Sequence, residues 1–341
     1  MPSDTGLDIE KVTSALSVRI PEFKGPWHEE KTKHGQSNPT YILQGKAVSL
    51  VLRRKPDGVL LRSAHMVERE YRVMKALRDT PVPVPKVFYL CQDPTEIGNI
   101  YFIMEHVKGV TFSEPSTPTL SIDERRRVYD NMNAGLVALH KVSPVSVGLA
   151  DFGKPGNYFE RQLSTWSRQF ENSMTEPIAE MELLNNWLLN NVPQEVSSSC
   201  IVHGDWRIDN LIFSKSDFSL TAILDWELST LGDPRADLAA QLMQWSMPLG
   251  TEGRGLSGAN RKALGIPEDK EYVELYSKRL GLSHPPDLEF SIAFSFFRMA
   301  AILQGIKKRT LDGNASNPEK GLKMGEYVKI FAKSALDHLK V

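Results

Sequence analysis

Two short polar segments, each placed after an apolar run, constrain the fold of this chain more than any other feature. The first reads His-Gly-Asp-Trp-Arg-Ile-Asp-Asn over residues 203–210, and the second reads Leu-Asp-Trp-Glu over residues 224–227. Apolar runs at 200–202, 211–213 and 222–224 flank them and are typical of short buried strands. Strands of this kind form a rigid scaffold for polar side chains at their ends. The pattern therefore predicts a loop-and-strand site in the second half of the chain.

The residue types in these segments, and their spacing, indicate phosphoryl transfer. Asp205 can accept the proton of a substrate hydroxyl, and the amide oxygen of Asn210 can bind Mg²⁺. Asp225, a carboxylate that follows a strand, would hold the metal against the phosphates of a nucleotide. The alternative is that each aspartate caps a turn and Asn210 fills a loop. A single such residue would favour that alternative, whereas the full set with its strands favours the catalytic interpretation.

The first 110 residues predict a β-rich region with one prominent helix. Apolar runs at 41–43 and 48–52 read as strands, with a Gln-Gly turn signal between them. Residues 63–79 carry apolar side chains at helical spacing, and extended segments at 86–91 and 99–106 follow. Residues 8–20 suggest a short amphipathic helix, the texture changes to strands over residues 27–54, and from there the expected order of elements is β-β-β-α-β-β.

A basic residue and an acidic residue in this region form a candidate phosphate-positioning pair. Arg53 ends a predicted strand, and Glu70 lies on the predicted helix. Kinases use such a pair to position the group that contacts the α- and β-phosphates. The open alternative is a solvated strand-end arginine and a surface glutamate. Residues 33–38, Lys-His-Gly-Gln-Ser-Asn, would form the turn over the phosphates, with backbone N–H groups and the Ser37 hydroxyl as donors.

Helices dominate after residue 108. A break rich in Gly, Pro, Ser and Thr near 108–120 is the predicted linker, so the expected domains are residues 1–108 and 109–341. Ser-Ile-Asp-Glu at 121–124 is a capping box that opens a helix to about residue 140. Further helical patterns cover residues 158–172, 176–191, 235–246, 268–280, 287–309 and 319–340. The expected fold class is α+β, with a small antiparallel β lobe and a larger, mainly helical lobe.

Composition excludes several classes of protein. With 41% hydrophobic residues, the 341-residue chain can build a sizeable core, and its net charge of −1 offers no basic footprint for nucleic acid. Two cysteines cannot form a disulfide framework. The longest apolar run, 291–306, contains Arg298 and reads as a buried helix rather than a membrane span. We therefore expect a soluble intracellular protein, cytoplasmic by default and mitochondrial or peroxisomal if it belongs to a longer chain.

From about residue 30 to residue 310 the chain resembles the aminoglycoside-phosphotransferase/choline-kinase-like family. Within it, the chain is most similar to the kinase-like region fused ahead of the dehydrogenase domain in acyl-CoA dehydrogenase family members ten and eleven. The resemblance implies a two-lobed protein-kinase-like fold and possible fusion to, or association with, such a dehydrogenase domain. The segments that carry it are 35–40, 51–54, 63–65, 69–71, 104–106, 203–205, 224–230 and 297–306.

The resemblance also implies a function and its residues. The function is phosphorylation of a small-molecule hydroxyl that depends on ATP and Mg²⁺, with nucleotide bound by the first domain and the acceptor by the second. The family's catalytic base falls on Asp205, its metal ligands on Asn210 and Asp225, its nucleotide-contacting base on Arg53 with Glu70, its adenine-binding backbone on the segment from Glu105 to Val107, and its structural support on His203 and Asp237.

The acceptor side of the site departs from the family's common pattern. Many members read HGDxHxGN, whereas this chain has Arg207 and Asp209. A guanidinium at Arg207 would bind a carboxylate or phosphate and repel a cationic acceptor. The open alternative is that Arg207 pairs with Asp209 or Glu227 and only stiffens the loop. With Arg207 and Glu227 as expected acceptor contacts, the resemblance favours a hydroxyacyl compound, free or as its CoA thioester.

Two other functions stay open at this stage. A nucleotide-binding pseudokinase or interaction module is favoured by arginine at position 53, where many members carry lysine, and by the glycine-poor phosphate loop. The intact set of Asp205, Asn210 and Asp225 opposes it. A choline-like amino-alcohol kinase would need an acidic acceptor pocket, which Arg207 disfavours.

Overall fold

The computed structural model describes residues 6–32, 38–57, 65–154, 156–195, 199–249, 254–313 and 317–341. The chain divides into two compact units. Unit 1 comprises Met1–Ser113, Leu120–Leu149 and Arg207–Ser229, and unit 2 comprises Glu114–Thr119, Ala150–Trp206 and Thr230–Val341. Unit 1 thus includes two segments from beyond the predicted linker, and the expected lobe boundary at residue 108 stays a prediction.

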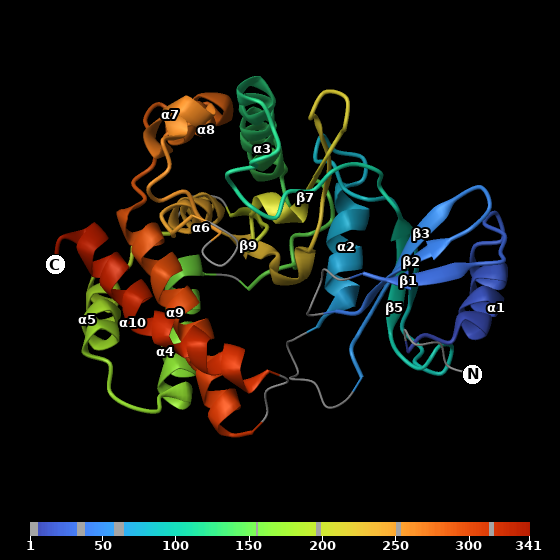
Figure 1. Cartoon of the computed structure of the whole chain (residues 1–341), viewed down its shortest axis with the longest axis horizontal. Coiled ribbons are helices and arrows are strands. Elements are labelled where there is room, and N and C mark those ends of the chain that lie inside the picture. Colours follow the sequence, from blue (N-terminus) through green and yellow to red (C-terminus); the bar gives the residue numbers. More distant parts are fainter. Residues whose placement is uncertain are drawn as a thin grey trace. The chain divides into compact units, whose positions relative to one another are not determined.

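An antiparallel sheet of five strands, in the order β1-β2-β3-β5-β4, forms the centre of unit 1 (Figure 1). The predicted order β-β-β-α-β-β is confirmed from β1 to β5, because α2 (Val67–Leu77) lies between β3 and β4 in the sequence, and helix α1 (Ile9–Arg19) precedes it. β3 is the middle strand, and all its residues after the first are buried, including Arg53 near its end. The strands are β1 (His28–Lys31), β2 (Thr40–Gln44), β3 (Ser49–Arg54), β4 (Val87–Cys91) and β5 (Tyr101–Glu105).

Helices in unit 1 bury one face each. Val12 and Leu16 of α1 (Ile9–Arg19) join the apolar cluster on one face of the sheet. On α2 (Val67–Leu77) the buried face includes Glu70, an acidic residue among apolar ones. The predicted capping box is present at the start of α3 (Ile122–Lys141).

The polar segments of the sequence lie beside short strands, as predicted. In unit 1, β7 (Leu211–Phe213) pairs with β8 (Leu220–Ile223), and the 3₁₀ turns η1 (Ile208–Asn210) and η2 (Trp226–Leu228) precede and follow this hairpin. In unit 2, β6 (Cys200–Val202) pairs with β9 (Thr230–Gly232). The strands are three or four residues long, so their side chains serve mainly to anchor the loops between them.

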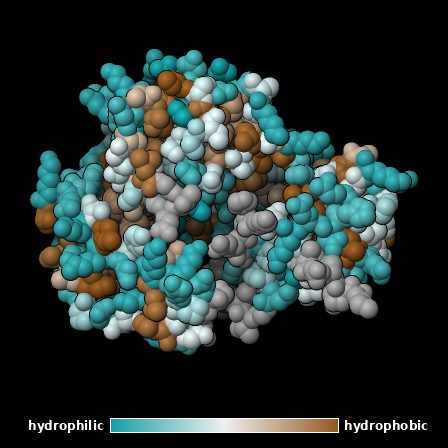
Figure 2. Space-filling model, in the orientation of Figure 1, coloured by the Kyte–Doolittle hydropathy of each residue, from teal (hydrophilic) through white to brown (hydrophobic). Residues whose placement is uncertain are grey.

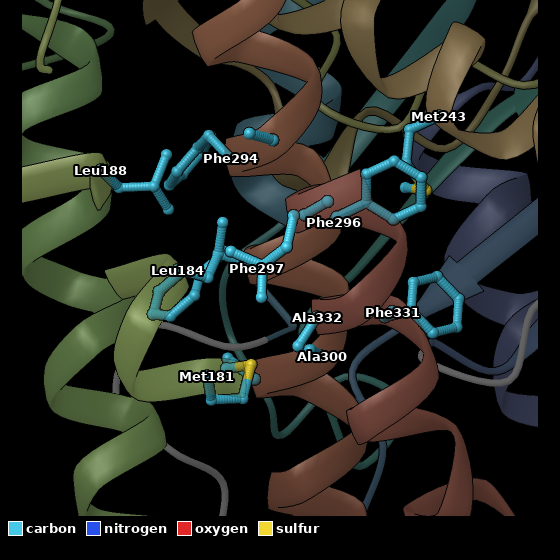
Figure 3. Packing of buried hydrophobic residues seen from close by; sticks show 14 of the residues in the cluster. Met181, Leu184, Leu188, Met243, Phe294, Phe296, Phe297, Ala300, Phe331 and Ala332 are labelled. Atoms are coloured by element: carbon cyan, nitrogen blue, oxygen red, sulfur yellow. The ribbon is translucent and has the colours of Figure 1, made fainter. Parts of the chain in front are cut away.

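The remaining helices belong to unit 2, where α4, α5, α6 and α10 pack against α9. Phe294, Phe296 and Phe297 of α9 lie in one buried cluster with residues of α4, α5 and α10 (Figure 3). By length and composition α9 could cross a membrane, yet 61% of its most apolar window is buried inside the protein, as expected for a core helix. These helices are α4 (Tyr158–Ser173), α5 (Ala179–Asn190), α6 (Arg235–Trp245), α7 (Arg261–Leu264), α8 (Asp269–Leu280), α9 (Glu289–Leu311) and α10 (Pro318–Leu339).

The visible surface is largely hydrophilic, with separate hydrophobic spots over α5 and α10 (Figure 2). Leu183 and Leu189 of α5 and Ile330 of α10 are exposed apolar side chains of these helices. Exposed apolar residues that are scattered singly are ordinary for a folded domain and indicate no particular partner.

Candidate active site

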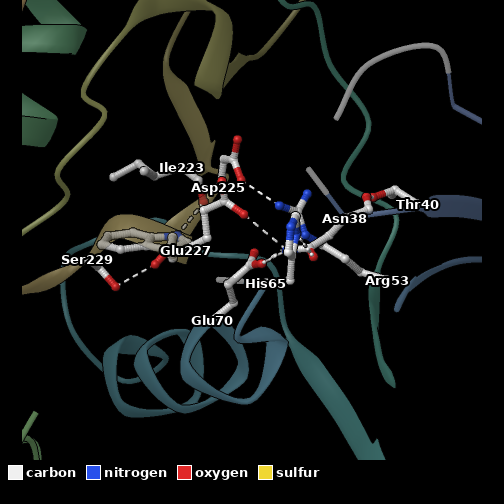
Figure 4. Close-up of polar contacts among 10 residues, drawn as sticks. Asn38, Thr40, Arg53, His65, Glu70, Ile223, Asp225, Glu227 and Ser229 are labelled. Carbon is white, nitrogen blue, oxygen red and sulfur yellow. Dashed lines mark hydrogen bonds and ion pairs between the residues drawn. The ribbon is translucent and has the colours of Figure 1, made fainter. Parts of the chain in front are cut away.

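A buried ion-pair cluster in unit 1 brings together three of the residues singled out from the sequence. The guanidinium of Arg53 donates from Nε to Glu70 Oε1 at 3.0 Å and from Nη2 to Asp225 Oδ1 at 2.5 Å. Figure 4 shows its side chain extending toward both carboxylates. The alternative of a solvated arginine and a surface glutamate is therefore wrong, because both side chains are buried.

Asn38 completes this cluster, although sequence reasoning treated it only as part of the phosphate loop. Its side chain is fully buried, and its amide nitrogen donates to Glu70 Oε1 and to Glu227 Oε2, each at 3.1 Å (Figure 4). Its amide oxygen lies 3.2 Å from His65 Nδ1. The one signal in the sequence was its place at the end of the segment 33–38. Ser37, the predicted phosphate donor, lies outside the described residues.

The electrostatics of the cluster favour a cation. Oxygen atoms of Glu70, Asp225 and Glu227 lie within 4.8 Å of one another. Burial raises the pKa of Glu70 to about 7; Arg53 opposes this rise, whereas the two neighbouring carboxylates add to it. Burial alone would lower the pKa of Arg53, but the three carboxylates raise it, so the guanidinium stays charged. Three ionised carboxylates facing one guanidinium would leave two negative charges.

This donor set fits Mg²⁺. Carboxylate and amide oxygens are the hard ligands that Mg²⁺ prefers, and a divalent cation would neutralise the two excess charges. The segments that carry Asn210 and Asp225 are also tied together, because Leu224 N donates to Asn210 O at 2.8 Å. Asp225 itself has a left-handed backbone, with φ of 63°. Aspartate adopts this conformation more readily than most non-glycine residues do.

The segment that carries Asp205 belongs to unit 2, and the side chain of Asp237 binds the backbone of this segment. The carboxylate of Asp237, which is fully buried, accepts from His203 N at 2.7 Å and from Gly204 N at 2.8 Å. Gly204 has φ of 81°, a conformation that glycine adopts without strain. The next amide, Asp205 N, donates to His203 Nδ1 at 3.2 Å. These contacts hold the backbone of residues 203–205; the supporting roles of His203 and Asp237 and the catalytic role of Asp205 stay predictions.

The other predicted contacts are distributed along unit 1. Arg207 forms an ion pair with Asp209, with 3.4 Å between Nη2 and Oδ2, which is one of its two alternatives. Glu227 lies in the cluster with Asn38. Glu105 is the exposed last residue of β5, and Val107 lies just beyond that strand. The adenine-binding role of this segment stays a prediction.

The profile of the phosphotransferase enzyme family matches residues 29–271 of this sequence. The chain belongs to this family. Its members transfer phosphoryl groups, and the chain is accordingly a phosphotransferase that acts on hydroxyl groups, as the sequence predicted. The two-lobed α+β kinase-like fold is confirmed as well.

Curated relatives place the chain near a particular branch of the family. It is 44% identical over 294 residues to acyl-CoA dehydrogenase family member 10 of Mus musculus, covering 86% of this chain and 27% of that protein. It is 37% identical over 319 residues to acyl-CoA dehydrogenase family member 11 of Rattus norvegicus, covering 92% of this chain and 41% of that protein. The chain thus spans less than half the length of these relatives, and the predicted resemblance is confirmed.

Solved structures agree with this assignment. A protein from Ralstonia eutropha JMP134, provisionally named an aminoglycoside phosphotransferase, is 42% identical with a TM-score of 0.88, and the match covers 98% of each chain. A thermostable mutant of aminoglycoside phosphotransferase APH(4)-Ia, in ternary complex with AMP-PNP and hygromycin B, is 12% identical with a TM-score of 0.64, covering 96% of this chain and 98% of that one. The second likeness shows the shared fold.

Proposed function

We propose that this phosphotransferase is an ATP- and Mg²⁺-dependent kinase that phosphorylates the hydroxyl of a small hydroxyacyl compound. The observation that carries the proposal is the buried cluster in which Arg53 faces Glu70, Asp225 and Glu227. A chain that only needed stability would gain little from placing the half-buried Asp225 and Glu227 next to the buried Glu70, because the desolvation and mutual repulsion of the three carboxylates are costly. A site that receives a divalent cation and phosphates would use them.

ATP is the proposed phosphoryl donor. The relative of the same fold that binds AMP-PNP supports an adenine nucleotide. In this chain Arg53 would contact the α- and β-phosphates, with Glu70 holding its guanidinium in place. The segment Glu105 to Val107 would offer backbone groups to adenine, as in the family it resembles.

Asn210 and Asp225 would hold Mg²⁺, with Glu227 beside them. The ion, when bound, supplies positive charge that stabilises the phosphates of the nucleotide. Arg53 would then share Asp225 with the cation, because its guanidinium already donates to that carboxylate.

Asp205 would act as the base and orient the acceptor. Its carboxylate accepts the proton of the acceptor hydroxyl while the hydroxyl oxygen bonds to the γ-phosphorus. The bond between the γ-phosphorus and the bridging oxygen breaks, and that oxygen leaves with ADP. Asp237 keeps the loop that carries Asp205 in place through two backbone amides.

The hydroxyacyl acceptor rests on the curated relatives, whose names include an acyl-CoA dehydrogenase. An enzyme that phosphorylates a hydroxyacyl group would suit a dehydrogenase domain in the same longer chain, because both would handle an acyl compound. We propose fusion or association with such a domain on this ground.

A screen for ADP release tests the proposal. Purified chain is incubated with ATP and Mg²⁺ and with hydroxy acids, their CoA thioesters, choline or kanamycin, and the Asp205→Asn variant serves as the blank. We expect turnover with hydroxyacyl compounds and a loss of roughly 10²- to 10⁴-fold in the variant. If the affinity for ATP is the same with and without Mg²⁺ and no acceptor is turned over, the protein is instead a pseudokinase.

A further inference from the structure

Arg298 places a guanidinium next to the loop that carries Asp205. It lies on α9 in unit 2, is half-buried, and donates from Nη2 to the carbonyl oxygen of Gly204 at 3.2 Å. That carbonyl belongs to the peptide group that leads into Asp205. The guanidinium of Arg298 is therefore hydrogen-bonded to the residue directly before the proposed base, Asp205.

The charge of Arg298 has no carboxylate partner within 4.0 Å among the residues that the structure describes. Its Nε is shielded from solvent and makes no hydrogen bond. Comparable arginines are neutralised: Arg53 by Glu70, Arg235 by Asp233 and Arg261 by Asp269. Because the side chain of Arg298 is only partly buried and its one hydrogen bond among the described residues uses Nη2, its guanidinium keeps N–H donors for an anion or an oxygen acceptor of a bound molecule.

Trp166 holds the guanidinium in one orientation. The ring of this α4 residue lies 5.5 Å from the guanidinium carbon, in a cation–π contact. The indole nitrogen donates to Gln162 Oε1 at 3.2 Å, which limits the rotation of the ring. A stacked arginine is pre-organised for a planar group with two oxygens, because less side-chain freedom is lost when it binds.

We propose that Arg298 anchors the carboxyl-derived oxygen of the acceptor, either a free carboxylate or a thioester carbonyl, while the acceptor hydroxyl faces Asp205. This inference rests on the proposed function and names a residue for its acceptor. Arg207, the anchor expected from the sequence, already has Asp209 as its partner and is the weaker candidate. Because the anchor is bonded to the peptide of Asp205, the acceptor has few carbons between its carboxyl group and its hydroxyl.

Kinetics of matched variants test the anchor. Arg298→Gln removes the guanidinium with its charge and its hydrogen bond to Gly204 O, Arg298→Lys restores a charged donor, and Arg309→Gln removes an exposed arginine from the same helix. The acceptors are 3- and 4-hydroxybutyrate, their CoA thioesters, and 1,4-butanediol, which has no carboxyl group. With Arg298→Gln we expect KM for the best carboxyl-bearing acceptor to rise about ten- to a hundredfold while KM for ATP is unchanged. Arg298→Lys should recover part of the loss, Arg309→Gln should match the wild type, and the rate with the diol should be equal in all forms.

The free carboxylate and the CoA thioester are distinguished by the acceptor KM: the form whose KM rises in Arg298→Gln is the one that Arg298 binds. A fall in kcat that is the same for every acceptor, with acceptor KM unchanged, would overturn the anchor and leave Arg298 as a brace for the Gly204 carbonyl. Efficient turnover of choline instead of hydroxy acids would also overturn the anchor, while the kinase function would stand.

Direct binding separates this inference from the proposed kinase function. Saturation-transfer NMR of the same hydroxy acids and thioesters is recorded on Asp205→Asn chain with and without Arg298→Gln, so no turnover is needed. Binding that requires Arg298 supports the anchor even if no ADP release is found with any acceptor. Equal binding, or no binding, in both forms overturns the anchor.

Discussion

Asp237 offers a sharp test of how the backbone of residues 203–205 is held. Its fully buried carboxylate accepts from two backbone amides, His203 N and Gly204 N. Each hydrogen bond to a charged group contributes about 1.5–3 kcal/mol, and an asparagine would keep one neutral bond of about 1 kcal/mol. Asp237→Asn also turns an NH₂ group toward a backbone N–H. We therefore expect the protein to lose about 2 to 5 kcal/mol of unfolding free energy.

Urea unfolding and hydrogen exchange measure this loss. The urea midpoint of unfolding should fall, and the backbone amides of residues 203 and 204 should exchange faster in peptide-resolved mass spectrometry. Asp93→Asn is the matched control, because exposed Asp93 accepts from the backbone amide of Thr95 at 2.9 Å. It should change stability little. Unchanged stability of Asp237→Asn, or unchanged exchange at these two amides, would refute this account of the loop.

Three further predictions concern the buried cluster of unit 1. Because the pKa of Glu70 rises from 4.5 to about 7 on folding, the native state binds a proton more tightly, and its contribution to stability is lost between those pH values. In urea titrations without Mg²⁺, the unfolding free energy of the wild type should fall by about 3 kcal/mol more than that of Glu70→Gln between pH 4 and pH 8. Unfolding free energies of the two proteins that change in parallel with pH would contradict this. Arg53→Lys should keep substantial ADP release and Arg53→Met should lose most of it, whereas equal activity of both would show that no charge is needed there. Asp225→Ala should abolish the strengthening of ATP binding by Mg²⁺ in calorimetry, and a wild-type response to Mg²⁺ would remove Asp225 from the metal site.

The secondary structure of this chain was largely readable from the sequence. The predicted patterns at 158–172, 268–280 and 319–340 correspond to α4, α8 and α10 within a few residues. The reason is that helical periodicity and caps are local: Ser121 and Glu124, three residues apart, make the predicted capping box of α3. Helix α2 begins at Val67, whereas the pattern suggested residue 63, which lies outside the described residues.

The pair of Arg53 and Glu70 was open in the sequence and decided by tertiary structure. A strand-end arginine and a helix glutamate can each be solvated, so the sequence alone left two interpretations. Packing of α2 beside the sheet of unit 1 buries both side chains, and a buried arginine and glutamate are far more stable together than apart.

Other contacts had no local signal at all. The amide of Asn38 joins carboxylates from α2 and from η2, segments far apart in the sequence. Arg207 pairs with Asp209, whereas no carboxylate among the residues that the structure describes lies within 4.0 Å of the Arg298 guanidinium. Both facts depend on which charges the folded chain brings close together. Residue types and spacing by themselves determined the helices, the strands and the chemistry that the site residues offer, because those properties are local. Only the tertiary structure decided which charges have an oppositely charged neighbour, because Coulomb energy depends on distance and burial in space rather than on separation along the chain.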